Sequence, residues 1–233
     1  MYSAQVEIIF FGSKSNKQKQ LNKLEIIKRN INNFKIFLVI AGTNTSQIPG
    51  ISAAGISAKS RRTTALADAE FLLKGASIDH KYKLPLLNAG VTPALISYVC
   101  SKLINVFPVI VPLGIGVKPY FNHLIVEERD LGPSNCLTTG KSMTKERVLN
   151  IYQRGLTIGK SLKQPVLISE SVPGGTTTAQ AVMEAFGLDV KNLMGSSLIK
   201  APRNLKSKVI KAGLANANLK NNFDSLDVIS SVG

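Results

Sequence analysis

The sequence is poor in several residue types that define whole classes of protein. Its 233 residues include no Trp, two Cys and two His. Cys100 and Cys136 form no CxxC pair, and His80 and His123 are isolated, whereas a zinc site needs about four closely placed nitrogen or sulfur ligands. Two such cysteines are typical of a reducing compartment. We therefore expect a cytoplasmic protein that binds no metal.

Long apolar segments are also lacking. The longest apolar run, Phe107–Val117, contains Pro and Gly and is too short to cross a bilayer as a helix. At the N-terminus no basic segment precedes an apolar run, and Glu7 interrupts the first apolar stretch, which argues against a signal peptide. A membrane is therefore not an expected partner.

Acidic residues are scarce, with 14 Asp and Glu against 29 Lys and Arg and a net charge of +15. Such an excess favours nucleic acid or an anionic surface as a partner. The lysines are scattered, however, and the densest basic segment, Lys14–Lys35, has few aromatic residues for stacking on bases. We interpret the charge as a solvated basic surface. A nucleic-acid-binding protein remains a third hypothesis, which predicts an affinity that falls steeply with salt.

What the sequence does contain is an alternation of apolar runs with helical patterns. A chain of this length, 44% hydrophobic, is able to bury the core of one large domain. The alternation predicts an α/β fold with a doubly wound, mostly parallel sheet in a Rossmann-like three-layer architecture. We expect one domain over residues 1–233, in which residues 1–35 form a strand–helix extension.

The predicted elements follow from the period of the hydrophobic pattern. Strands are expected at Gln5–Phe11, Ile36–Ala41, Leu84–Leu87, Phe107–Val111 and Pro165–Ile168. Helices are expected at Lys17–Asn33, Thr64–Lys74, Ala94–Leu103, Met143–Leu162, Leu205–Ala215 and Phe223–Ser231, and from the threonines at 176–178 to Phe186.

Polar turns follow three of the apolar runs, at Gly42, Asn88 and Glu170. In a parallel sheet the carboxyl ends of the strands share one edge, and ligands bind there. The long Gly42–Gly55 loop has a length that is usually functional inside a compact domain. The candidate ligand contacts from the first two turns are Thr43, Thr45, Ser46, Asn88 and Thr92.

The third turn is the most informative part of the sequence. An apolar run stops at Glu170, and a Pro-Gly-Gly turn and three threonines then begin a helix. A helix N-terminus presents free N–H groups to an anion, and glycines let the backbone approach a phosphate. The candidate phosphate-binding residues here are Gly174, Gly175, Thr176 and Thr177. Glu170 is the candidate catalytic residue.

Each of these residues also has a purely structural interpretation. Glu170 would cap the next helix or pair with a lysine, the glycines would serve only a tight turn, and the threonines would act as N-caps. Asp68 and Glu70 would be first-turn acids that satisfy the helix dipole. A P-loop at Gly155–Ser161 is rejected because three residues, instead of four, separate its glycines within a helical pattern.

The pattern Glu-x-x-x-Gly-x-Thr-Thr at 170–177, after a hydrophobic strand, resembles the signature of the nicotinate-nucleotide:dimethylbenzimidazole phosphoribosyltransferases, which act in assembly of the cobalamin lower ligand. Three further segments are similar to a poorly characterised prokaryotic sister family of that enzyme. They are Ala41–Gly55, Ala67–Glu70 and Thr92–Leu95. The resemblance covers nearly the whole chain.

The resemblance implies a pentosyltransferase that needs no cofactor. It would move the 5-phosphoribosyl group of nicotinate mononucleotide to a benzimidazole-type base and release nicotinate, and it would form a homodimer. Glu170 would stabilise a ribosyl cation or accept the proton of the incoming base.

Family members continue beyond the position of Gly233, so the resemblance also implies a chain truncated at its C-terminus. The alternative hypothesis is a non-catalytic nucleotide-binding module or a truncated, inactive homologue. Substitution of Glu170 by Gln separates the enzyme from the binding module, because only the enzyme loses turnover while it retains its ligand.

Overall fold

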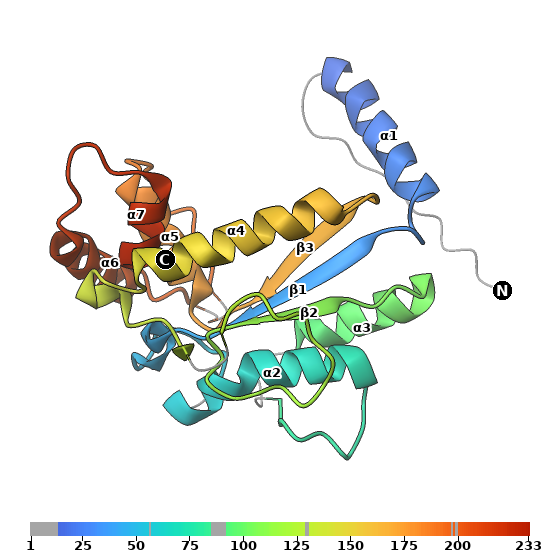
Figure 1. The fold of residues 1–233 in the computed structure, drawn as a ribbon, viewed down its shortest axis with the longest axis horizontal. Helices are drawn as coiled ribbons and strands as arrows, with labels where there is room; N and C mark the ends of the chain where they lie inside the picture. Colours follow the sequence, from blue (N-terminus) through green and yellow to red (C-terminus); the bar gives the residue numbers. More distant parts are fainter. Residues whose placement is uncertain (1–13, 56, 85–91, 129–130, 197, 199) are drawn as a thin grey trace.

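A three-stranded parallel sheet forms the centre of the molecule, with helices on both faces (Figure 1). The computed structural model describes residues 14–55, 57–84, 92–128, 131–196, 198 and 200–233. The strand order is β2-β1-β3, with both neighbours of β1 parallel to it. The strands are β1 (Lys35–Ala41), β2 (Val109–Leu113) and β3 (Val166–Ser171). The predicted α/β fold with a parallel sheet is confirmed.

The described helices occupy the regions where the hydrophobic pattern predicts them. They are α1 (Lys14–Arg29), α2 (Ala58–Lys74), α3 (Pro93–Ile104), α4 (Lys145–Ser161), α5 (Gly175–Ala185), α6 (Arg203–Ala217) and α7 (Ser225–Val232). Short 3-10 helices, η1 (Asn44–Gln47) and η3 (Leu137–Thr139), lie within the longer loops. Of the predicted strands, Gln5–Phe11 and all but the first residue of Leu84–Leu87 lie outside the described residues.

Two predicted element boundaries that bear on the site are wrong. Helix α2 begins at Ala58 and not at Thr64, because Ser57 and Ser60 form a capping box that the hydrophobic pattern does not reveal. Asp68 and Glu70 therefore lie in the C-terminal half of the helix, and their interpretation as first-turn acids is also wrong. Strand β3 continues past Ile168, so Glu170 lies within the strand and not after it.

The alternation of side chains along the strands explains the two covered faces of the sheet. Leu38, Ile40 and Ile110 pack with α2 on one face. Phe37 and Val111 lie on the opposite face, in a cluster that includes residues of α4. Successive residues of a strand point to opposite faces, so one short hydrophobic run supplies both cores. A third cluster joins α5, α6 and α7 beyond the sheet.

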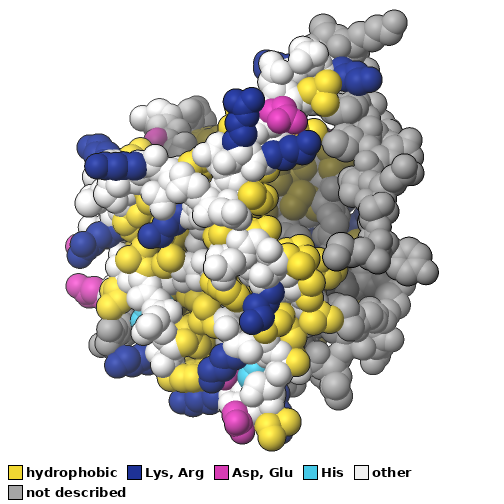
Figure 2. Space-filling model, turned by 90° about the vertical axis from the view of Figure 1, so that its right-hand side faces the viewer, with side chains coloured by type: hydrophobic (Ala, Val, Ile, Leu, Met, Phe, Trp, Pro, Cys, Tyr) yellow, Lys and Arg dark blue, Asp and Glu magenta, His cyan; other side chains and the backbone are white. Residues whose placement is uncertain are grey.

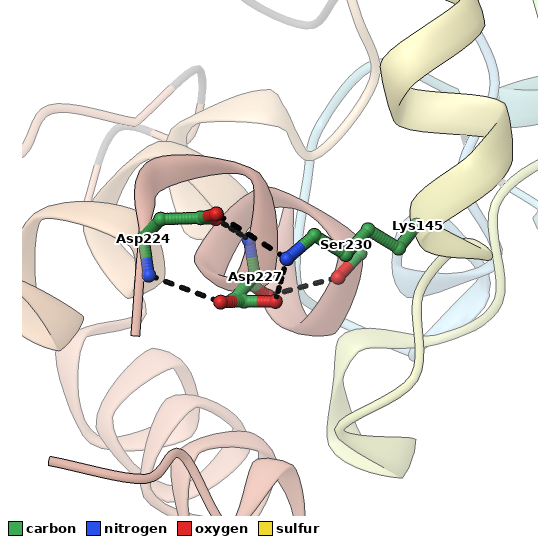
Figure 3. Close-up of polar contacts among 4 residues, drawn as sticks. All are labelled: Lys145, Asp224, Asp227 and Ser230. Atoms are coloured by element: carbon green, nitrogen blue, oxygen red, sulfur yellow. Dashed lines mark hydrogen bonds and ion pairs between the residues drawn. The ribbon is translucent and has the colours of Figure 1, made fainter. Parts of the chain in front are cut away.

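An ion pair joins the N-terminal ends of α4 and α7 (Figure 3). Asp224 and Asp227 form the capping box of α7, and the Nζ atom of Lys145 lies 3.3 Å and 2.6 Å from their carboxylates. The backbone N–H of Asp224 and the ammonium group of Lys145 both donate to the carboxylate of Asp227, and together they lower the pKa of Asp227. Because the pair is exposed, it fixes the register of the two helices more than it stabilises the fold.

The basic residues do not gather into one patch on the face that Figure 2 shows. Lys and Arg side chains are scattered around a broad hydrophobic area, with a few acidic side chains among them. This agrees with a solvated basic surface. None of the described helices combines the length and the apolar character that a membrane crossing needs.

Glu70 is a fully buried acid in the core-facing side of α2. Its carboxylate accepts the backbone N–H groups of Lys81 and Tyr82, at 3.0 Å and 2.9 Å, and the ammonium group of Lys74, at 3.1 Å. Burial alone would raise its pKa, but these hydrogen bonds outweigh burial and hold the pKa of Glu70 below its usual range. Glu70 thus ties the segment after α2 to the helix.

Replacing Glu70 with Gln should lower the free energy of unfolding at pH 7 by about 1.5–3 kcal/mol, because a charged acceptor of two amides is lost. The lowered pKa of Glu70 means that its contribution is present above the unfolded value of about 4.3 and is lost as the pH falls through the folded pKa. Urea unfolding between pH 7 and pH 3.5 should show a weaker pH dependence for the variant. Equal losses from Glu70→Gln and from Glu25→Gln, on the exposed helix α1, would contradict this role.

Candidate functional site

The carboxyl end of β3 places Glu170 at the edge of the sheet. Glu170 pairs in register with Val39 of β1 and remains exposed. Neighbouring protein atoms still desolvate its carboxylate in part, which raises the pKa of Glu170. No hydrogen bond or ion pair to this carboxylate comes from the described residues. The structure therefore supports neither the helix-cap nor the lysine-pair interpretation, and the acid is available for other chemistry.

The turn after β3 places the N-terminus of α5 beside the loop that follows β1. Gly174 is the N-cap of α5 and has a φ of 77°, a left-handed conformation that favours glycine. No side chain caps this helix, so the interpretation of the threonines as N-caps is wrong. A Cβ atom on Gly174 would lie 3.4 Å from the Cα atom of Ser46. The structure thus brings two of the predicted turns together.

Lys206 is a residue that the sequence analysis missed at this place. It lies on α6 and is only 2% exposed, and its Nζ atom donates to Thr176 Oγ1 at 2.7 Å and to the carbonyl of Gly195 at 2.8 Å. Burial lowers the pKa of Lys206. A lysine ammonium has three donors, and the described residues supply acceptors for two. Its spacing with Val209, Ile210 and Gly213, which form the buried face of α6, is the signal that would have revealed it.

Thr177 is fully buried, and its hydroxyl has no hydrogen-bond partner among the described residues. Buried hydroxyl groups in proteins are nearly always hydrogen-bonded, because an unpaired one costs free energy. Thr176, one residue earlier, is exposed and accepts from Lys206. In the first turn of α5, the Thr177 hydroxyl therefore has no partner among the described residues, and the Thr176 hydroxyl is oriented by the buried Lys206.

The hydroxyl groups of the Thr43–Ser46 segment are occupied within the protein. Thr45 Oγ1 accepts the backbone N–H of Leu137 at 3.0 Å, and Thr43 Oγ1 accepts that of Thr45 at 3.1 Å. Ser46 donates to the carbonyl of Thr43 at 2.7 Å. All three side chains are buried. They stabilise the shape of the loop, and their contact with a ligand stays a prediction.

Arg61 stabilises the same loop from α2. Its guanidinium is buried and donates to the carbonyl oxygens of Ser46, Gln47 and Gly55. In the described part of the chain no carboxylate pairs with Arg61, nor with Lys206. Buried charges are normally paired or neutralised. Two buried cations without carboxylate partners therefore adjoin the loops at this edge of the sheet.

Asp68 connects Thr92, from the predicted Asn88 turn, to the site. Its carboxylate accepts Ser171 Oγ at 2.8 Å, at the end of β3, and Thr92 Oγ1 at 3.1 Å, at the N-cap of α3. Burial raises the pKa of Asp68, although the two hydroxyl hydrogen bonds lower it. Thr92 is thereby held near the carboxyl end of β3. Asn88, the other predicted residue of that turn, lies outside the described residues.

A mostly apolar cavity of about 410 Å³ opens at the carboxyl ends of the strands. Gly42 and Thr43 after β1 and Val172 after β3 form part of its wall, and Ile151 of α4 and Leu226 of α7 form another part. Its size and lining suit a small aromatic ligand. No cluster of three or more metal-binding side chains is found in the described residues.

The chain is similar to UPF0284 proteins of cyanobacteria. It is 80% identical over 233 residues to one from Prochlorococcus marinus strain AS9601, covering 100% of this chain and 60% of the relative. It is 40% identical over 222 residues to one from Parasynechococcus marenigrum strain WH8102, covering 95% of the chain and 56% of the relative. No protein-family model matches. The chain spans about three fifths of the length of the curated relatives it matches.

Two solved structures from Thermus thermophilus share the fold. CobT gives a TM-score of 0.59 at 18% sequence identity and covers 86% of this chain and 55% of its own. A nicotinate-nucleotide–dimethylbenzimidazole phosphoribosyltransferase gives 0.58 at 18% identity and covers 86% and 54%. The chain has a phosphoribosyltransferase-like fold. The family resemblance found in the sequence is confirmed: the solved structures share the fold, and the relatives in sequence are the UPF0284 proteins.

Replacing Arg61 with Lys should lower the free energy of unfolding by about 1–3 kcal/mol, because one ammonium group cannot reach all three carbonyls and leaves buried acceptors unpaired. Hydrogen exchange should rise within residues 46–55. Arg62→Lys, the neighbouring exposed arginine, is the matched control. Unchanged exchange in this loop for Arg61→Lys would show that the guanidinium does not hold it.

Proposed function

We propose that the protein transfers the 5-phosphoribosyl group of nicotinate mononucleotide to a benzimidazole-type base and releases nicotinate. The observation that carries the proposal is Lys206, a buried cation that orients Thr176 at the first turn of α5. A phosphate bound there would meet the positive end of the helix, the backbone beside Gly174 and Gly175, and the remaining donor of the ammonium group. The fold shared with the two Thermus thermophilus proteins supports the same assignment.

Glu170 would act at the reacting carbon of the ribose. Departure of nicotinate from the pyridinium form needs no strong general acid, because the ring nitrogen becomes neutral as the bond breaks. The transition state resembles a ribosyl oxocarbenium ion, which a nearby carboxylate stabilises. The raised pKa of Glu170 also makes its carboxylate a stronger acceptor for the proton that the incoming base releases.

The apolar cavity would hold the acceptor base. Val172 and Thr178 line it, and both flank the turn that carries Gly174 and Gly175. An aromatic base in this cavity would therefore lie beside that turn. Apolar walls would also exclude water, which competes with the base for the ribosyl cation.

Replacing Lys206 with Met should weaken binding of nicotinate mononucleotide at least tenfold, because the buried positive charge is lost while the apolar stem is retained. Titration calorimetry with the chain measures the affinity, and thermal unfolding verifies that the variant is folded. Lys208→Met, an exposed lysine of α6, is the matched control. If both variants bind as the native chain does, Lys206 does not contact the phosphate.

Replacing Glu170 with Gln should leave the affinity for nicotinate mononucleotide within about twofold and reduce nicotinate release at least a hundredfold, the usual contribution of a catalytic carboxylate. Chromatographic detection of nicotinate measures turnover with benzimidazole acceptors, and Glu146→Gln on α4 is the control. A chain that binds the nucleotide but releases no nicotinate would favour the non-catalytic module. Absence of binding by this chain and of release by the longer AS9601 relative would contradict the proposed function.

A further inference from the structure

Strand β3 presents apolar side chains on both faces of the sheet. Leu167 is 51% exposed and Ile168 is 73% exposed, and as successive residues they point to opposite faces. Strands of parallel sheets are normally covered on both faces, which is why they are almost continuously hydrophobic. The first half of β3, Val166–Ile168, has this composition, and the described residues do not supply the cover that usually accompanies it.

An edge position alone does not explain this exposure. Strand β2 is the other outer strand in the order β2-β1-β3, yet its Ile110 and Val111 are buried. The segment after β2 returns to cover it, and the backbone N–H of Leu124 donates to the carbonyl of Ile110 at 2.8 Å. Among the described residues β3 pairs with β1 alone, and Phe37, the register partner of Ile168, is buried. The side chain of Phe37 on β1 is therefore buried, whereas its neighbour Ile168 on β3 is exposed.

We propose that the free edge of β3 binds a parallel β-strand from the polypeptide that the UPF0284 relatives have in addition to the matched region. The matched region is 60% of the AS9601 relative, which leaves two fifths of that protein for other structure. A parallel strand needs a crossover connection of a dozen or more residues, usually a helix, and this length is ample for both. The strand would cover the edge, and its helix would cover Leu167 or Ile168.

The apolar character and the direction of the proposed partner strand follow from β3 itself. The exposed side chains at positions 167 and 168 are apolar, so the partner strand must be apolar on both faces, in contrast to the basic surface elsewhere. Because β1, β2 and β3 are parallel, the carboxyl end of the added strand would lie next to Glu170. Polar residues that follow this strand would then join the same edge of the sheet as the loops after β1 and β3.

The test combines this chain with the part of the AS9601 relative outside the matched region, expressed as a separate polypeptide. We expect a one-to-one complex by size exclusion with light scattering, and at least tenfold slower hydrogen exchange of the Val166–Ser171 amides in the complex. Ile168→Asp should weaken association at least tenfold. Leu103→Asp, at a side chain of α3 that is 80% exposed, is the matched control and should not weaken it.

Three results would overturn the proposal. The first is that the two polypeptides do not associate at micromolar concentrations. The second is a complex in which the β3 amides exchange as fast as in the chain alone, or in which Ile168→Asp and Leu103→Asp have equal effects. The third is a dimer of this chain alone that protects the β3 amides, which would make a second copy the occupant. None of these readouts depends on nucleotide binding, so the proposed function is tested separately.

Discussion

The parallel pairing of β1 with both β2 and β3 is the constraint on which the rest of the structure depends. It places the carboxyl ends of three strands at one edge, so the loop after β1, the turn after β3 and the end of β2 meet although they are far apart in sequence. It also divides the hydrophobic residues of β1 between α2 on one face and α4 on the other. Without this register, Thr43 after β1 and Val172 after β3 would not line one cavity.

Two buried cations hold the loops at that edge, and in the proposed function they would favour an anionic ligand there. Arg61 holds the loop after β1 by its carbonyl oxygens, and Lys206 holds Thr176 at the start of α5. Neither has a carboxylate partner in the described part of the chain. Burial of an unpaired charge is unfavourable, and an anionic ligand would offset part of that cost. Structural support and the proposed ligand recognition would therefore depend on the same groups.

The sequence predicts the parts of this molecule that local physics determines. The Ile36–Ala41 run, the helical period of α4 and α6 and the glycine turn before α5 are all local properties, and the structure agrees with them. The start of α2 was missed because a capping box of two serines, and not hydrophobic period, sets it. The helical spacing places Lys206 on the buried face of α6, but its partner Thr176 follows only from the packing of α5 against α6, which no local pattern encodes.

The environment of Glu170 links the site to the architecture of the sheet. Glu170 lies on a strand that pairs with β1 alone among the described residues, and its partly desolvated carboxylate is exposed. A catalytic carboxylate is more effective in a site from which water is excluded, because its interaction with a developing cation is then less screened. The proposed strand and helix that would cover the hydrophobic side chains of β3 would therefore also exclude water from Glu170. The packing of β3 and the proposed catalysis would both require that this edge of the sheet be covered.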